Sequence, residues 1–206
     1  MTEPKSQDEQ ERHRAKMAKR KAAQDAEVAG KGIAEKGLLI VNTGTGKGKS
    51  TAAFGLLLRM VGHGKKTGVV QFIKGAWDTG ERSVLEGFGD LVRWHTLGEG
   101  FTWETQDRVR DMAAAAKAWE TAKALMAEPD LKLLVLDELN IALRYDYLPL
   151  DAVVATLKSR RPDLHVVVTG RNAKPAIIEA ADLVTEMTLV KHHFAAGVKA
   201  QEGIEF

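Results

Sequence analysis

From residue 37 onward, short hydrophobic runs alternate with longer amphipathic segments. Short runs rich in Val, Ile and Leu are typical of strands that are buried on both faces of a parallel sheet. We predict strands at 38–42, 67–73, 90–95, 131–137, 164–170 and 183–190. Helical patterns lie between them at 49–62, 80–87, 104–127, 150–160 and 174–181. This alternation predicts a three-layer α/β domain with a mostly parallel sheet.

Residues 1–36 have a different pattern from residues 37–206, which we expect to form the folded domain. The first segment is rich in Lys, Arg, Ala and Glu and has few large apolar residues, so it cannot build a core of its own. We expect a helical or disordered arm with a basic cluster at Arg14, Lys16, Lys19, Arg20 and Lys21. Either the arm is solvated, or it orders over an anionic ligand or a partner subunit. Its interspersed acidic residues argue against an organelle transit peptide.

Composition excludes several classes of protein. The 30 basic residues nearly balance the 28 acidic ones, so nucleic acid is not an expected partner. The absence of cysteine excludes disulfides, iron–sulfur clusters and thiolate catalysis. No apolar run approaches the roughly 18 residues of a membrane span, so we expect no membrane association and a cytoplasmic location.

The stretch TGTGKGKS, at 43–50, follows the first predicted strand and precedes a predicted helix. A glycine-rich turn in this context presents backbone N–H groups and a helix N-terminus to phosphate oxygens. Lys49 would offset phosphate charge and the Ser50 hydroxyl would bind Mg²⁺, although a purely structural turn is the alternative. The usual spacing requires glycine at position 43, where this chain has Thr43. The expected phosphate-binding positions are Gly44, Thr45, Gly46, Lys47, Gly48, Lys49, Ser50 and Thr51.

Asp137 and Glu138 follow the apolar run LLVL at the end of a predicted central strand. Carboxylates in this position can reach Mg²⁺ directly or through water, whereas elsewhere such a pair is often a turn or helix cap. With the glycine loop present, we predict a metal site of Ser50, Glu138 and Asp137. These elements favour a phosphate-loop NTPase-like fold of RecA type, and they fit ATPases, kinases and helicases equally.

Further blocks of sequence narrow this choice. They are RMVGHGKKTGVVQFIKG (59–75), GERSVLE (80–86), GFTWETQ (100–106), VLDELNIALRYDYLP (135–149), VVTGR (167–171) and VKHHFAAGVKAQEGIEF (190–206). With the loop, they resemble the bacterial ATP:corrinoid adenosyltransferases of cobalamin synthesis and salvage from about Gly37 to Phe206. The family loop is G-N-G-K-G-K-[TS], from which this chain departs at Thr45. The N-terminal arm matches the family pattern poorly. From the resemblance we therefore infer for the arm only the possibility that it forms a lid.

The resemblance implies that a cobalt(I) corrinoid attacks the ribose 5′ carbon of ATP and that triphosphate leaves. Gly44 to Ser50 would wrap the triphosphate, with Lys49 in a catalytic role and Asp137 behind the metal ligands. Mg²⁺ is the implied metal, and Mn²⁺ could replace it. Phe101 and Trp103, which could otherwise be core residues, would form an apolar wall against the corrin and keep the lower axial ligand off cobalt.

The resemblance also implies a homodimer, and a reduced flavoprotein is one candidate electron donor. An early a,c-diamide intermediate, cobinamide and cobalamin are all candidate corrinoids. His192 and His193 have no Cys, Asp or third His at ligand spacing nearby, so we do not expect them to bind cobalt or zinc. We expect Lys191 and His192 to contact nucleotide or a neighbouring subunit, whereas His63, Lys74 and Arg171 stay open.

Two alternatives remain on sequence grounds. The first is a phosphate-loop ATPase or small-molecule kinase in which Glu138 orients a nucleophile. The second is a nucleotide-regulated binding module without turnover. An obvious nucleophile–base pair is missing from the sequence, which disfavours a hydrolase and agrees with attack by cobalt(I), which has no proton to lose.

Overall fold

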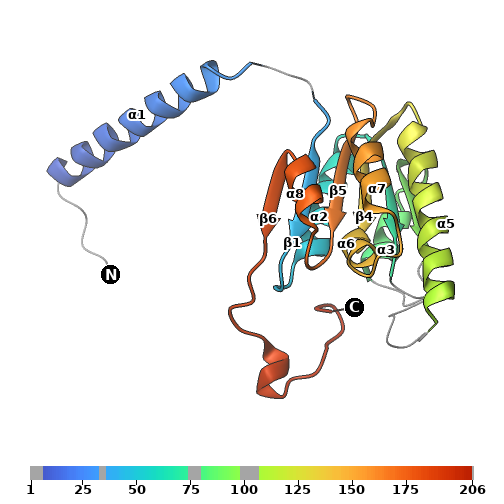
Figure 1. Cartoon of the computed structure of the whole chain (residues 1–206). Helices are drawn as coiled ribbons and strands as arrows, with labels where there is room; N and C mark the ends of the chain where they lie inside the picture. The colour runs from blue at the N-terminus through green and yellow to red at the C-terminus, as the bar shows by residue number, and fades with distance from the viewer. Residues whose placement is uncertain (1–6, 33–35, 74–79, 98–106, 206) are drawn as a thin grey trace. The chain divides into compact units, whose positions relative to one another are not determined.

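The structure is a computed structural model that describes residues 7–32, 36–73, 80–97 and 107–205 (Figure 1). The chain divides into two compact units, residues 1–35 and residues 36–206. The second unit contains every strand of the described chain and both hydrophobic clusters.

The larger unit is built on a six-stranded sheet with the order β3-β2-β4-β5-β1-β6. Its strands are β1 (Leu39–Thr43), β2 (Lys66–Gln71), β3 (Val92–Thr96), β4 (Leu131–Asp137), β5 (His165–Thr169) and β6 (Leu183–Glu186). Every neighbouring pair is parallel. All strands consequently end at one edge of the sheet, where residues distant in sequence meet.

Helices cover both faces, which confirms the expected three-layer α/β fold (Figure 1). One face carries α2 (Lys49–Gly62) and α3 (Gly80–Glu86). The other carries α5 (Arg108–Ala127), α6 (Leu139–Arg144), α7 (Leu150–Lys158) and α8 (Pro175–Ala180). Short 3₁₀ helices occur at Gly89–Leu91 and His193–Ala196.

Alternate residues of each strand serve opposite faces, because successive side chains of a strand point in opposite directions. Leu39 and Val41 of β1 join the cluster under α5 to α8, whereas Ile40 joins the cluster under α2 and α3. The central strands are thus buried on both sides. This explains why they read as continuous apolar runs in the sequence.

Two elements among the described residues differ from the sequence prediction by more than two residues, whereas the other bounds shift by at most two, as at β3, where Asp90 and Leu91 lie in a 3₁₀ helix. The strand predicted at 183–190 ends at Glu186, because β1, its partner among the described strands, ends at Thr43 and the chain turns into the glycine loop. The helix α6 was not predicted, because its six residues are too few to show a helical period. The helix predicted at 104–127 begins at Arg108 in the structure, and residues 104–106 lie outside the described residues. Asp107 is its N-cap, because the Asp107 side chain accepts a hydrogen bond from the Arg110 N–H.

The smaller unit contains one described helix, α1 (Gln7–Ala29). Its described side chains are all exposed, and the Arg12–Asp8 pair spans one turn at 3.0 Å. Such exposed pairs contribute only a few tenths of a kcal/mol, about 0.3–0.5 each. No helix in the described part of the chain combines the length and the apolarity that crossing a membrane requires.

Because the hydrophobic clusters lie wholly in the larger unit, we expect a variant lacking residues 1–30 to remain folded. Its thermal unfolding midpoint should shift by less than about 2–4 °C, the shift that 1 kcal/mol causes in a protein of this size. Circular dichroism on heating measures this. An unfolded truncation product would show that the arm is part of the folding unit.

Candidate functional site

The glycine loop lies between β1 and α2 at the carboxyl edge of the sheet. Gly44 and Gly48 have φ angles of +94° and +104°, in the left-handed region that favours glycine. Gly48 is the N-cap of α2 and provides no side chain to cap it. The first N–H groups of α2 therefore stay available to an anion, as in phosphate-binding loops.

The loop packs against the chain that follows β6. The Gly46 N–H donates to the Met187 carbonyl at 2.6 Å. A Cβ added at Gly44 would lie 2.4 Å from the Met187 carbonyl oxygen, and one added at Gly46 would lie 2.8 Å from it. Both distances are too short for a side chain, so close backbone contact requires glycine at both positions, and at Gly44 the positive φ favours glycine as well.

Thr43, where the usual spacing has glycine, is still part of β1. It pairs with Glu186 of β6, and its Oγ1 accepts from the Ala173 N–H at 3.1 Å. The loop thus begins one residue later than in the usual pattern. At its other end, the Asn42 side-chain amide donates to the Lys49 carbonyl at 3.2 Å and ties the base of the loop together.

Lys49 is largely buried, and its ammonium donates to the Gly46 carbonyl. Burial lowers the pKa of Lys49, the nearby Glu138 carboxylate raises it in part, and Arg171 and Lys47 lower it further. Lys47 and Arg171 therefore both lie near enough to act on the charge of Lys49. This concentration of positive charge beside a helix N-terminus favours a multiply charged anion.

Asp137 is fully buried at the end of β4 and joins several elements. Its Oδ1 accepts from the hydroxyls of Ser50 at 2.6 Å and Thr169 at 2.8 Å, and its Oδ2 accepts from the Gln71 amide at 3.0 Å. A carboxylate that accepts on both oxygens is suited to fix the Ser50 hydroxyl. The sequence missed Gln71 and Thr169, although both are polar residues that end apolar strands beside β4.

Glu138 directly follows Asp137 in a left-handed conformation with φ of 62°. Such a conformation costs a non-glycine residue about 1 kcal/mol or more. Its N–H donates to Thr169 Oγ1 at 2.9 Å, and its carboxylate lies against Gly170, where an added Cβ would be 3.0 Å from Glu138 Oε2. The strained backbone thus directs this carboxylate along the edge that contains Lys49.

These residues fit a hard divalent cation by the chemistry of their donors. Ser50 offers a hydroxyl oxygen and Glu138 a carboxylate, the ligand types that Mg²⁺ prefers. Asp137 already accepts from three donors, so it is better placed to orient Ser50 than to bind metal itself.

The other predicted residues fall into three groups. Thr45, Lys47 and Thr51 are exposed around the loop. His63 caps the far end of α2, about 20 Å from the loop by helix rise, and so is not part of this site. Phe101, Trp103 and Lys74 lie outside the described residues.

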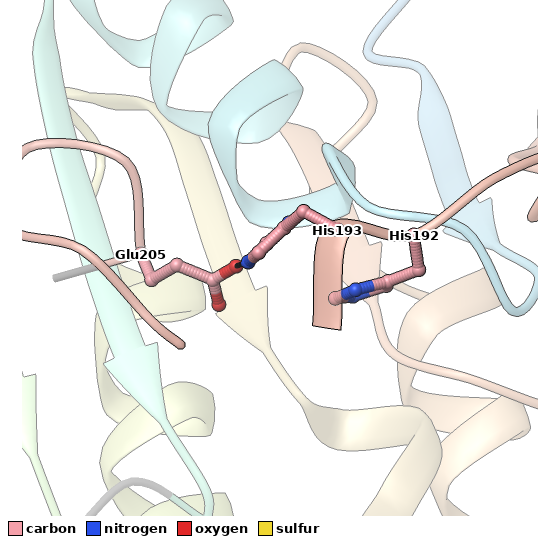
Figure 2. Close-up of side chains that lie close together, drawn as sticks. All are labelled: His192, His193 and Glu205. Carbon is pink, nitrogen blue, oxygen red and sulfur yellow. Dashed lines mark ion pairs between the residues drawn. The ribbon is translucent and has the colours of Figure 1, made fainter. Parts of the chain in front are cut away.

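The C-terminal segment brings unpredicted groups to the loop. Glu205 forms an ion pair with Lys47, and His193 Nε2 lies 3.1 Å from Glu205 Oε1 (Figure 2). His192, His193 and Glu205 lie close enough to form a cluster of metal-binding types. Sequence spacing found no third ligand beside the histidines, because Glu205 returns to them only through the fold.

An apolar pocket of about 370 Å³ lies between α2 and α3. It is lined by Thr51, Phe54, Gly55, Leu58, Gly80, Glu81, Val84 and Leu85. Thr51, one of the lining residues, lies in the first turn of α2. The apolar pocket is therefore next to the glycine loop.

Comparison with known proteins matches residues 35–206 to the family of ATP:corrinoid adenosyltransferases BtuR/CobO/CobP. A second family, the N-terminal segment of cob(I)alamin adenosyltransferases, matches residues 1–28. The expectation that the arm would lie outside the resemblance was therefore wrong. A polar helix lacks the glycine turns and buried strands that made the other blocks recognisable.

Named relatives agree along nearly the whole chain. A corrinoid adenosyltransferase of Sinorhizobium is 59% identical, covering 95% of this chain and 92% of its own. One of Pseudomonas aeruginosa is 56% identical and covers 98% of each. The corrinoid adenosyltransferase CobA of Salmonella typhimurium is 49% identical, covering 95% of this chain and 98% of its own.

The contact between Gly46 and Met187 yields a prediction with an internal control. Gly46→Ala should weaken binding of inorganic tripolyphosphate by tenfold or more, because its Cβ would displace the backbone on which the loop rests. Gly62→Ala, at a helical position with open space, should leave binding unchanged and stabilise the protein by up to about 1 kcal/mol. Calorimetric titration and thermal unfolding measure the two effects. Equal binding by both variants would contradict the close-packing argument.

Proposed function

Because this chain belongs to the ATP:corrinoid adenosyltransferase family, we propose that its glycine loop holds the triphosphate of ATP as a leaving group. The protein is an enzyme that transfers the 5′-deoxyadenosyl group of ATP to a corrinoid in cobalamin biosynthesis. The observation that carries the proposed role of the loop is the gathering of Lys47, Lys49 and Arg171 around an uncapped helix N-terminus.

In this reaction the electron pair of cobalt(I) forms the bond to C5′ of the ribose. The bond between C5′ and O5′ breaks, and its electron pair stays on O5′ of the departing triphosphate. The corrinoid loses no proton, so the protein needs no general base. Its tasks are to align carbon with cobalt and to offset the charge that develops on the leaving oxygen.

Each residue of the loop has a distinct task in this proposal. The N–H groups at the start of α2 and the backbone of Gly44 to Gly48 hold phosphate oxygens. Lys49, already among cations, gains a favourable partner when triphosphate binds, and Lys47 adds charge at the exposed side. Thr45 and Thr51 contribute hydroxyls around the loop.

We propose that Mg²⁺, or Mn²⁺ in its place, is held by Ser50 and Glu138, with Asp137 orienting Ser50. The metal supplies charge neutralisation to the triphosphate when bound. The hydrogen bonds to Asp137 from Thr169 and Gln71 support this assignment, because they fix the carboxylate that accepts from Ser50.

Phe101 and Trp103 are proposed from the family pattern to form an apolar wall at the corrin face. The pocket between α2 and α3 provides apolar surface that could extend such a wall. A homodimer in the cytoplasm, with a reduced flavoprotein as electron donor, completes the proposal. An ATPase or kinase is not favoured, because the relatives are corrinoid adenosyltransferases.

Product analysis tests the function directly. Under anaerobic conditions with cobalt(I) corrinoid, ATP and Mg²⁺, we expect adenosylated corrinoid and tripolyphosphate in equal amounts. Lys49→Ala should lower kcat/KM by about 100-fold or more, the usual loss when one preorganised electrostatic contact is removed. Corrinoid spectra and chromatography of phosphates provide the measurement. Formation of ADP and orthophosphate alone would refute the proposal.

The lowered pKa of Lys49 predicts how ATP use depends on pH. Its ammonium binds triphosphate, so the contribution is complete below the lowered pKa and is lost as pH rises through it. The alkaline decline in kcat/KM for ATP should therefore begin below the ordinary lysine pKa of 10.5. Lys49→Arg keeps its charge and should remove this decline, whatever its effect on the maximal rate. An unchanged decline in the arginine variant would assign it to another group.

A further inference from the structure

The C-terminal segment contacts the glycine loop at two separate points. After β6, the Met187 carbonyl accepts from the Gly46 N–H. The chain then runs past the carboxyl edge of the sheet and through the 3₁₀ helix at His193–Ala196 (Figure 1). It returns so that Glu205 pairs with Lys47, a contact that joins residues 158 positions apart. The segment thus meets the base of the loop and one of its lysines.

The second contact places a carboxylate among cations. Glu205 pairs with Lys47, and its side chain is only 15% exposed. Figure 2 shows the Glu205 carboxylate directed at the ring of His193. The hydrogen bond from Lys47 is the main cause of its lowered pKa, with smaller contributions from His193 and His192. The negatively charged Glu205 side chain therefore pairs with a lysine of the loop that we propose binds the triphosphate.

The same three residues are poorly arranged for a metal ion. His192 Nδ1 accepts from the Phe194 N–H at 3.1 Å, which assigns the proton of neutral His192 to its other nitrogen. The two imidazole rings stack, with 4.7 Å between their centroids and 28° between their planes. The Glu205 carboxylate already forms an ion pair with Lys47. The cluster is better suited to hold a carboxylate than a cation.

One of the two carboxylate oxygens of Glu205 lacks a well-aligned hydrogen bond within the described residues. This oxygen, Oε1, is buried and lies 3.1 Å from His193 Nε2. A buried carboxylate oxygen without a full set of hydrogen bonds is costly. A phosphate group would also accept hydrogen bonds from the N–H groups of α2. It is therefore a better partner than Glu205 for the Lys47 ammonium.

We propose that Glu205 is an intramolecular competitor of the triphosphate for Lys47. In the nucleotide-free protein the Glu205 carboxylate forms an ion pair with the Lys47 ammonium. Binding of triphosphate displaces the carboxylate from Lys47. When the carboxylate returns to Lys47, it helps the product triphosphate to leave. This inference rests on the proposed function only in assigning Lys47 to the triphosphate.

Binding of inorganic tripolyphosphate to the full chain tests this competition. Glu205→Gln removes the charge and keeps the shape, so it should tighten binding by about fivefold, the scale of one partly exposed ion pair. It should also slow tripolyphosphate dissociation. Glu202→Gln removes a charge from an exposed position of the same segment and should match the wild type. Equal or weaker binding by Glu205→Gln would overturn the inference.

A double-mutant comparison locates the effect. In a Lys47→Met background, Glu205→Gln should no longer tighten binding, because the competition requires the ammonium. Tightening that persists there would overturn the role of Lys47. Thermal unfolding without ligand, with Glu205→Ala as a second variant, checks that each protein is folded.

The failures of the two proposals can be told apart. If the wild type did not bind tripolyphosphate at all, the proposed role of the loop would fail and this inference with it. If it bound but Glu205→Gln made no difference, the inference alone would fail. The anaerobic product assay remains an independent measure of the function.

Discussion

The buried carboxylate of Asp137 is the constraint on which the site depends. A fully buried carboxylate is tolerated only when its oxygens accept hydrogen bonds, and here the donors come from α2, β2 and β5. The side-chain oxygen Oε1 of Gln71 in turn accepts from the Thr96 hydroxyl at 2.9 Å and from the Trp94 indole N–H at 3.2 Å, which fixes the orientation of the Gln71 amide. The network therefore links Ser50 to both neighbours of β4 and to the edge strand β3.

This network explains why the fold and the site are difficult to separate. The order β2-β4-β5 is what brings Gln71 and Thr169 to the two sides of Asp137. Thr169 also accepts from the Glu138 N–H, so the residue that satisfies the buried carboxylate holds the strained backbone of the next one. The strain at Glu138 is compensated by contacts that exist only when the strands are correctly ordered.

The sequence predicted those parts of the protein that follow from local pattern. Buried parallel strands read as apolar runs, and the glycine loop reads as a strand-to-helix turn, because neighbouring residues determine both. Gln71, Thr169 and Glu205 could not be assigned in this way, since their roles depend on strand order or on the return of the C-terminal segment. The end of β6 at Glu186 escaped prediction for a related reason: it depends on where β1 ends.

The spacing of the glycine loop takes its meaning from these contacts. Thr43 remains in the sheet, paired with Glu186 of β6, so the turn is confined to the five residues from Gly44 to Gly48. Gly44 and Gly46 are then pressed against Met187, and the backbone that follows β6 becomes one wall of the loop. A side chain on either glycine would force that wall away. The short loop and the C-terminal segment are thus one structural unit, and this is why an acidic residue near the end of the chain can reach a lysine near its beginning.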